Sequence, residues 1–115
     1  MNHTIYIRNL DTYNNLKHNN KKYELRIYKG IFTTLKINDV IDIKFKDNII
    51  QKRIKNIYLF NNFKELFNNL ELNLCLPHID NKNDALKYMK TFYSSNKINK
   101  SKIIALELFD FSPNF

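Results

Sequence analysis

Two segments of the chain alternate apolar and polar residues with a period of two, which restricts each to a strand with one covered face. Over 23–28, the two faces carry Tyr23, Leu25 and Ile27 against Glu24, Arg26 and Tyr28. Over 40–45, they carry Ile41, Ile43 and Phe45 against Asp42 and Lys44. Asp47-Asn48 then predicts a hairpin turn into a third strand, 49–59. The apolar phase of that strand slips between Ile54 and Ile57, which predicts a β-bulge near Lys55-Asn56.

Periodicity elsewhere predicts three helices and two further strands. A strand is expected over 4–8, followed by a short helix that Asp11 can cap, with two apolar residues on one face, Tyr13 and Leu16. Asn62 caps a second helix in which Glu65 completes a capping box, and a third helix is expected over 82–93. The segment 103–109 is largely apolar, which is typical of a central or barrel-closing strand.

The order of these elements decides the fold class: strand, helix, three strands, two helices, strand. Strands cluster instead of alternating with crossover helices. The sequence therefore predicts an α+β fold, a small β-barrel or curved antiparallel sheet of about five strands with two to three helices. A chain of 115 residues with 43% hydrophobic residues can bury one core, and two domains would each be too small. Residues 1–115 are thus expected to form a single domain.

The charge and the cysteine content of the chain indicate which kinds of partner and which cellular compartment to expect. The formal net charge of +8 favours an anionic partner such as nucleic acid. However, 16 lysines against 3 arginines is also what an AT-rich genome encodes. Cys75 is the only cysteine, so no internal disulfide is expected. The N-terminal residues contain no apolar leader and no apolar run reaches membrane length, so we expect a cytoplasmic or nuclear protein that is not secreted and not in a membrane.

Several short segments carry a family resemblance when they are taken in order. Residues 19–26 read N-N-K-K-Y-E-L-R, and residues 35–41 read L-K-I-N-D-V-I. Further along stand Phe63-Lys64-Glu65-Leu66, Leu76-Pro77, Phe92-Tyr93-Ser94 and Ile103-Ile104-Ala105-Leu106-Glu107-Leu108. Together these segments resemble the ASCH domain, a relative of the PUA-like β-barrels, whose signature is G-x-K-x-x-E-x-R. Asn19 and Asn38 stand where the family prefers Gly, and because Asn tolerates positive φ, both turns are expected to survive.

Lys21, Glu24 and Arg26 are the best candidates for a binding site. Glu24 and Arg26 lie two apart on one strand and project from one face, with Lys21 beside the turn at its start. A carboxylate between two cations stays ionised and orients their donors, so the group can grip a phosphate or the edge of a nucleobase. The pattern alone fits a solvated ion pair better. The resemblance to ASCH domains instead implies a cleft. Tyr93, at the end of the third predicted helix, is expected in the core, with a hydroxyl that could reach the cleft as the alternative.

The function we expect is a small nucleic-acid-binding domain, for RNA in particular, that uses a Lys/Glu/Arg cleft. The alternative is an amidohydrolase or nuclease that acts on a modified nucleoside or on RNA, with Lys21 and Glu24 as catalytic residues. Some small bacterial ASCH proteins hydrolyse acetylated cytidine with a lysine at the position of Lys21, a threonine at that of Glu24 and a separate glutamate. Here only the lysine matches, and Glu65 and Glu71 are the nearest acids in order. The residues leave enzyme and binder open.

A second basic group crowds the predicted hairpin. Lys44, Lys52, Arg53 and Lys55 are candidate nucleic-acid contacts, and tyrosines on neighbouring strands offer stacking faces. A solvated, lysine-rich edge that discourages aggregation explains the same pattern equally well. The three histidines are scattered without acidic partners at ligand spacing, so neither a metal nor another cofactor is expected. Cys75, between Leu74 and Leu76, is predicted to be a buried, inert thiol.

Overall fold

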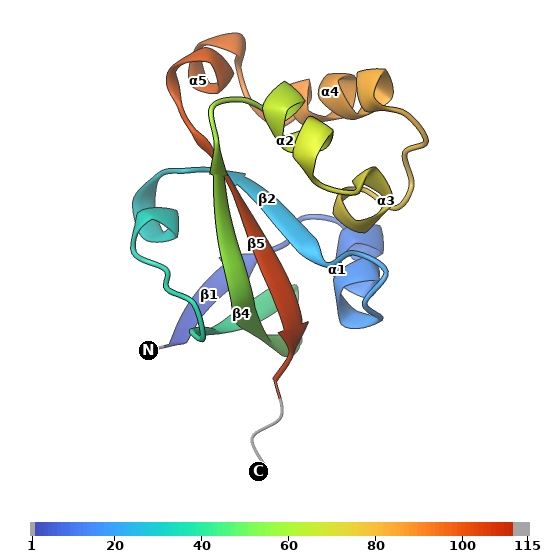
Figure 1. Cartoon of the computed structure of the whole chain (residues 1–115). Helices are drawn as coiled ribbons and strands as arrows, with labels where there is room; N and C mark the ends of the chain where they lie inside the picture. The colour runs from blue at the N-terminus through green and yellow to red at the C-terminus, as the bar shows by residue number, and fades with distance from the viewer. Residues whose placement is uncertain (1, 112–115) are drawn as a thin grey trace.

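A single curled sheet of five strands organises the molecule, and the structure, a computed structural model, describes residues 2–111 (Figure 1). The strands are β1 (Asn2–Tyr6), β2 (Tyr23–Ile27), β3 (Val40–Phe45), β4 (Asn48–Phe60) and β5 (Ile103–Asp110). Their order in the sheet is β1-β3-β4-β5-β2. The predicted α+β class with about five strands is confirmed, and the last strand is central, as expected of an apolar segment.

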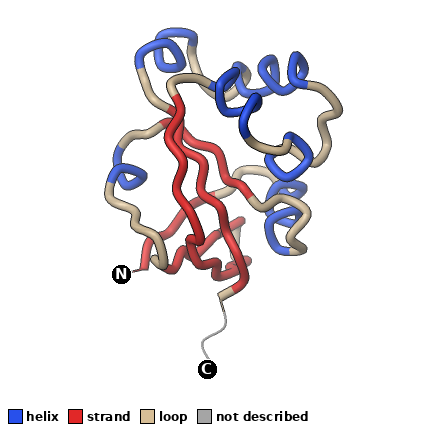
Figure 2. The backbone as a smooth tube through the Cα atoms, viewed as in Figure 1, coloured by secondary structure: helices blue, strands red, loops and turns tan. Residues whose placement is uncertain are grey.

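The sheet curls into a half-barrel that stays open between its two edge strands. β1 runs parallel to β3, whereas the β3/β4, β4/β5 and β5/β2 pairs are antiparallel. The sheet is therefore mixed, because one parallel pair stands beside three antiparallel ones. Figure 2 shows the strands gathered into one curled sheet, with most of the helices above it and to its right. Among the described strands, β1 and β2 form no ladder with each other. This unpaired seam positions the site described below.

The helices are more numerous than the two to three expected. They are α1 (Leu10–Lys17), α2 (Phe63–Asn69), α3 (Leu72–Cys75), α4 (Lys82–Lys90) and α5 (Ser95–Lys100), with a 3-10 turn, η1 (Gly30–Thr33). The helices that were not expected, α3 and α5, have only four and six residues, too few to show helical periodicity. Figure 1 shows α2, α3 and α4 gathered at one end of the sheet, with α1 beside the edge strand β2.

Two apolar cores lie on the two faces of the sheet. The inner core fills the half-barrel and includes Leu16, Ile41, Ile43, Ile54 and Leu106. The outer core lies between the sheet and the helices and includes Leu25, Phe63, Phe67, Ala85 and Ile103. Because adjacent residues of β5 supply both cores, this strand is buried on both faces.

The predicted bulge and hairpin turn lie within one residue of their expected positions, whereas the third predicted helix, 82–93, ends three residues early, at Lys90. The bulge lies between Ile54 and Asn56, as predicted from the phase slip. The hairpin turn comes one residue earlier than expected, at Lys46-Asp47, because Phe45 pairs with Asn48.

The helix caps follow the same pattern of partial agreement. Asn62 caps α2 by accepting from the Glu65 amide, as predicted, although the Glu65 carboxylate bonds to the Asn61 side chain. The expected cap of α1, Asp11, lies in the first turn instead, because the side chain of Asn9 accepts from the Thr12 amide.

Two turns use asparagine in the left-handed conformation, as the sequence predicted. The φ values are 64° for Asn19 and 76° for Asn38. Asn reaches this region at lower cost than other residues with a Cβ, because its short polar side chain bonds locally. These turns precede β2 and β3, so they set where each strand begins.

Replacing Asn38 tests this backbone requirement. We expect Asn38→Gly to keep the free energy of unfolding within about 0.5 kcal/mol, and Asn38→Ala to lower it by about 1 kcal/mol. Urea unfolding measures both. Asn96→Ala, in the helix α5, is the matched control and should be neutral or slightly stabilising. Equal stability of the Ala and Gly variants at position 38 would contradict the requirement.

Candidate functional site

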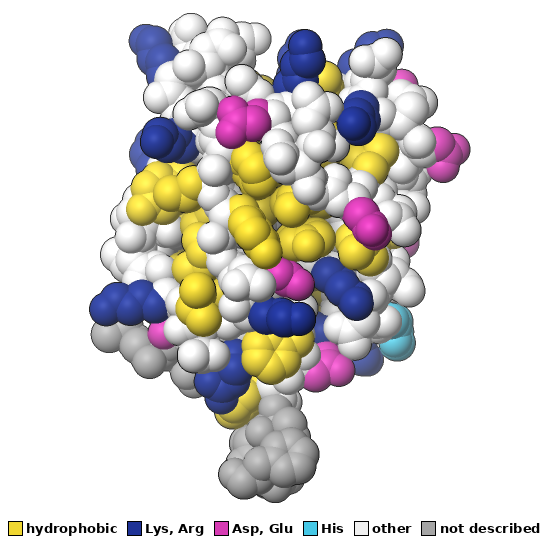
Figure 3. Space-filling model, in the orientation of Figure 1, with side chains coloured by type: hydrophobic (Ala, Val, Ile, Leu, Met, Phe, Trp, Pro, Cys, Tyr) yellow, Lys and Arg dark blue, Asp and Glu magenta, His cyan; other side chains and the backbone are white. Residues whose placement is uncertain are grey.

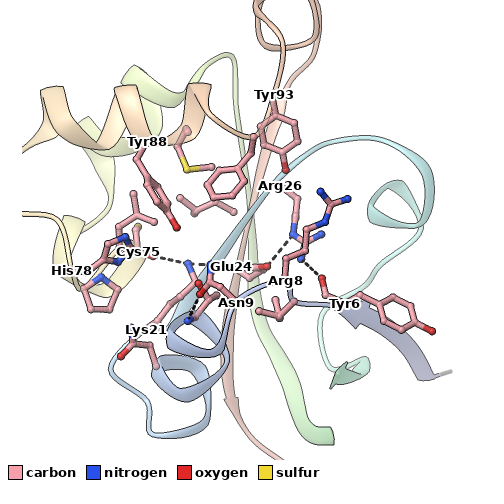
Figure 4. A pocket seen from close by; sticks show the side chains of 18 residues that line it. Tyr6, Arg8, Asn9, Lys21, Glu24, Arg26, Cys75, His78, Tyr88 and Tyr93 are labelled. Carbon is pink, nitrogen blue, oxygen red and sulfur yellow. Dashed lines mark hydrogen bonds and ion pairs between the residues drawn. The ribbon is translucent and has the colours of Figure 1, made fainter. Parts of the chain in front are cut away.

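A pocket of about 220 Å³ opens at the seam between β1 and β2 (Figure 4). Four parts of the chain meet there: the end of β1 and the start of α1, the turn into β2 and that strand itself, the residues after α3, and the end of α4. All four predicted ligand-binding residues line it, Lys21, Glu24, Arg26 and Tyr93. The structure thus brings Tyr93 to the other three across about 70 residues of chain.

The floor of the pocket is a linked cluster of charges centred on Glu24. One carboxylate oxygen, Oε1, lies 3.5 Å from Nζ of Lys21, and the other, Oε2, accepts from Nε of Arg26 at 2.9 Å. Lys21 also donates to the backbone carbonyl of Cys75 at 2.5 Å. Arg26 donates through Nη2 to the carbonyl of Tyr6 at 3.0 Å, so its guanidinium joins β2 to β1 across the unpaired seam.

The cluster is buried, which the alternation of β2 alone did not predict. Lys21 and Glu24 are each 5% exposed. The half-buried strand expected from the pattern has buried residues on both faces, because Leu25 and Ile27 pack under the helices while Glu24 lines the pocket and pairs across the sheet with Leu106 of the inner core. A solvated ion pair is therefore not what the structure contains.

Burial and the neighbouring charges shift the pKa values of this cluster. Burial lowers the pKa of Lys21, and the attraction of Glu24 only partly opposes this. For Glu24, burial alone would raise the pKa, but the charges and hydrogen bonds of Arg26 and Lys21 outweigh it and hold the pKa below its usual value. Glu24 is therefore an anion at neutral pH.

Aromatic side chains form the wall opposite the charges. Tyr88 packs edge-on against His78, with ring centroids 4.8 Å apart, and against Phe92 at 4.9 Å. Tyr93 is stacked on Phe63 at 6.3 Å, which fixes its ring beside the pocket. Sequence reasoning missed Tyr88, His78 and Phe92. The first two share no motif with the charged cluster, and Phe92, which is 48% exposed, stood out only as part of the Phe92-Tyr93-Ser94 segment.

Cys75 contributes its backbone and not its thiol. The side chain is fully buried, as predicted, and burial raises the pKa of the thiol to about 11. A thiol with that pKa is protonated at neutral pH and is a poor nucleophile. The carbonyl of the same residue, at the end of α3, is what holds the Lys21 ammonium.

The described lining of the pocket contains one carboxylate, that of Glu24. The two acids considered as catalytic partners lie elsewhere. Glu65 is in the first turn of α2, where it bonds to Asn61, and Glu71 is exposed at the start of α3. Within residues 2–111, no three metal-ligating side chains come together, and no helix is long and apolar enough to cross a membrane.

The basic residues of the hairpin do not form one surface. Lys52 is buried, because its ammonium donates to Asp110 at 2.7 Å and to Asn19 at 2.8 Å. This burial disfavours the nucleic-acid contact that the sequence predicts at Lys52. Arg53 donates to the Asn38 carbonyl at 2.7 Å.

The other two hairpin lysines remain nearer the solvent. Lys55 is exposed and lies 4.0 Å from Glu107, while Lys44 is half-buried on β3. On the face seen in Figure 3, Lys and Arg side chains are spread out among acidic ones and form no single patch.

Comparison with known proteins shows the fold. No protein-family profile matches the chain, and no curated protein is similar to it. The solved structures that are similar to it include the following two. One is the crystal structure of the hypothetical protein PH0355, with a TM-score of 0.86 and 22% identity over 96% of this chain and 100% of that one. The other is the solution structure of a Pyrococcus furiosus protein, with a TM-score of 0.77 and 25% identity over 94% and 96%.

Glu24→Gln tests the charged cluster. The variant removes the negative charge that the buried Lys21 and the half-buried Arg26 share, so we expect the free energy of unfolding at pH 7 to fall by about 3–5 kcal/mol. Because the pKa of Glu24 is lowered in the folded protein, its stabilisation is complete above the unfolded pKa of about 4.3 and is lost as the pH falls through the folded pKa. The gap between native protein and variant should therefore shrink in acid.

Chemical denaturation between pH 3 and 8 measures this gap. Glu71→Gln is the matched control, since that carboxylate is exposed, and its effect should stay within about 0.5 kcal/mol at every pH. If Glu24→Gln were as stable as the native protein at pH 7, the cluster would not be the buried ionic network described above.

Proposed function

We propose that the protein is a small nucleic-acid-binding domain, for single-stranded RNA, that takes one base into the pocket at the β1/β2 seam. The observation that carries the proposal is the pairing of a charged floor with an aromatic wall in one pocket. Aromatic rings stack on any base, and a fixed carboxylate and cations can read the polar edge of that base. The resemblance to ASCH domains and the net charge of +8 support the same class of ligand.

Each wall of the pocket has a distinct role in this proposal. Tyr88 supplies the stacking face, since its ring is held by His78 and Phe92. Glu24 accepts from an exocyclic amine of the base. Lys21 and Arg26 keep Glu24 ionised and donate to base or phosphate, while the cluster stays preorganised because each member already has a protein partner.

Binding of a fluorescent 12-residue single-stranded RNA, followed at several salt concentrations, tests the proposal. We expect salt-dependent affinity. Tyr88→Leu should weaken it at least about fivefold, because base stacking on one aromatic side chain is worth about 1–3 kcal/mol. Phe109→Leu is the matched control, an exposed ring on β5 outside the pocket lining, and should leave the affinity within about twofold.

Two results would contradict the proposal. One is an RNA affinity too weak to measure at low salt. The other is an RNA affinity that falls in Arg53→Gln but is unchanged in both Tyr88→Leu and Arg26→Gln. That result would place the RNA-binding surface on the hairpin. Thermal unfolding of each variant separates a loss of contact from a loss of fold.

The second candidate is an amidohydrolase acting through Lys21, and one observation favours it. Burial lowers the pKa of Lys21, which brings an amine nearer to the range where it can act as a base or nucleophile. Against it stand the glutamate at position 24, where the family's hydrolases carry threonine, and the single carboxylate in the described lining.

Incubation with acetylated cytidine distinguishes the two candidates. We expect no release of cytidine, because hydrolysis needs a nucleophile, a proton carrier and an oxyanion donor within mutual reach, and Lys21 is already held by Glu24 and the Cys75 carbonyl. Chromatography after overnight incubation with native protein measures this. Turnover that Lys21→Arg abolishes and Lys97→Arg preserves would establish the enzyme instead.

A further inference from the structure

Arginine is concentrated at the pocket although it is rare in the chain. Of the 3 arginines, Arg8 and Arg26 line this pocket, whereas the 16 lysines supply only Lys21 to the lining. Codon bias that favours lysine does not explain two arginines at one place. A guanidinium presents a rigid fork of donors that suits carboxylate and phosphate groups, which an ammonium cannot imitate.

The negative charge in the described pocket lining does not balance the positive charge of Arg8 and Arg26. Glu24 is the one carboxylate in the described lining, and it is already bonded to Arg26 and lies beside Lys21. Among residues 2–111, no acidic side chain lies within 4.0 Å of the Arg8 guanidinium. Whatever the protonation state of Lys21, the pocket therefore holds more positive than negative charge.

Tyr93 lies beside these two side chains. Burial raises the pKa of its hydroxyl and Glu24 adds to that rise, whereas the charge of Arg26, the Ile27 backbone and the charge of Arg8 act in the opposite direction. Figure 4 shows the Tyr93 hydroxyl directed toward Arg26, with Arg8 alongside. Two guanidiniums and a hydroxyl donor on one side of a pocket form a complement to an anionic oxygen cluster.

The N-terminal end of α1 adds to the positive electrostatic potential near the two arginines. Asn9 and Thr12, from the cap and first turn of that helix, also line the pocket. The N-terminal end of a helix carries a partial positive charge, which favours an anion nearby. The helix end supplements the arginines and would not form a site without them.

We propose that Arg8, Arg26 and the Tyr93 hydroxyl form a phosphate subsite at the mouth of the pocket. The ligand is then a nucleotide, in a strand or free, and not an unphosphorylated nucleoside. The identity of the group that bears the phosphate rests on the proposed function, but the anion site stands on its own geometry. Arg26 belongs to both the charged cluster and the phosphate subsite. Its Nε donates to Glu24 and its Nη2 donates to the Tyr6 carbonyl, and the remaining N–H donors of the guanidinium are left for the anion.

Titration with inorganic phosphate tests the subsite without assuming any base. Arginine Nε and backbone amide resonances of isotopically labelled protein are followed by NMR. We expect shifts at Arg8, Arg26 and Tyr93 in the native protein, their loss in Arg8→Gln, and their retention in Lys97→Gln, which removes the same charge from the exposed surface of α5. No shift at these residues, or the same shift in Arg8→Gln, would overturn the subsite.

The salt dependence of RNA binding gives a second readout. Loss of one phosphate contact lowers the slope of log affinity against log salt by about 0.7 for a single strand. Arg8→Gln should show this lower slope and an affinity about tenfold weaker at low salt, and Lys97→Gln should show neither. Phosphate binding without RNA binding would contradict the proposed function but not the phosphate subsite. The subsite, but not the proposed function, would be contradicted if RNA bound, Arg8→Gln kept the native salt slope, and inorganic phosphate caused no NMR shifts.

Discussion

Glu24 carries a negative charge inside the protein, and removing such an ion from water costs several kcal/mol unless charges of opposite sign lie beside it. Lys21 and Arg26 supply those charges, and each is tied in turn to a backbone carbonyl, of Cys75 and Tyr6. The network therefore connects α3, β2 and β1. These are the elements whose separation leaves room for a pocket, so the same contacts hold the fold together and shape the site.

The open seam follows from this choice of contacts. A closed barrel would pair β1 with β2 along their backbones and leave no space between them. Here a side chain, the Arg26 guanidinium, makes the connection, and the helices α3 and α4 supply the far wall. The result is a concave surface with ionised groups on one side and aromatic rings on the other, held mostly by rigid elements. A ligand that is flat, polar at its edge and anionic at one end matches that surface.

Much of the fold could be predicted because its signals are local. Alternation identified β2 and β3, and a phase slip located the bulge in β4. The site was only partly predictable. Lys21, Glu24 and Arg26 stand close together in the sequence, but whether Glu24 is solvated or buried depends on helices some 50 residues later. Tyr88 and Arg8 reach the pocket through tertiary packing, which the spacing of residues in the sequence does not reveal. The burial of Lys52 against Asp110 at the far end of β5 was hidden for the same reason.

The central claim is that ligand binds at the seam and not on the hairpin. Backbone NMR shifts during titration with single-stranded RNA test it most directly, because both surfaces report in one experiment. We expect the largest shifts over residues 6–9, 21–26, 76–78 and 88–93, with little change over 44–55. Shifts concentrated over 44–55, with the residues around Lys21 unmoved, would contradict it.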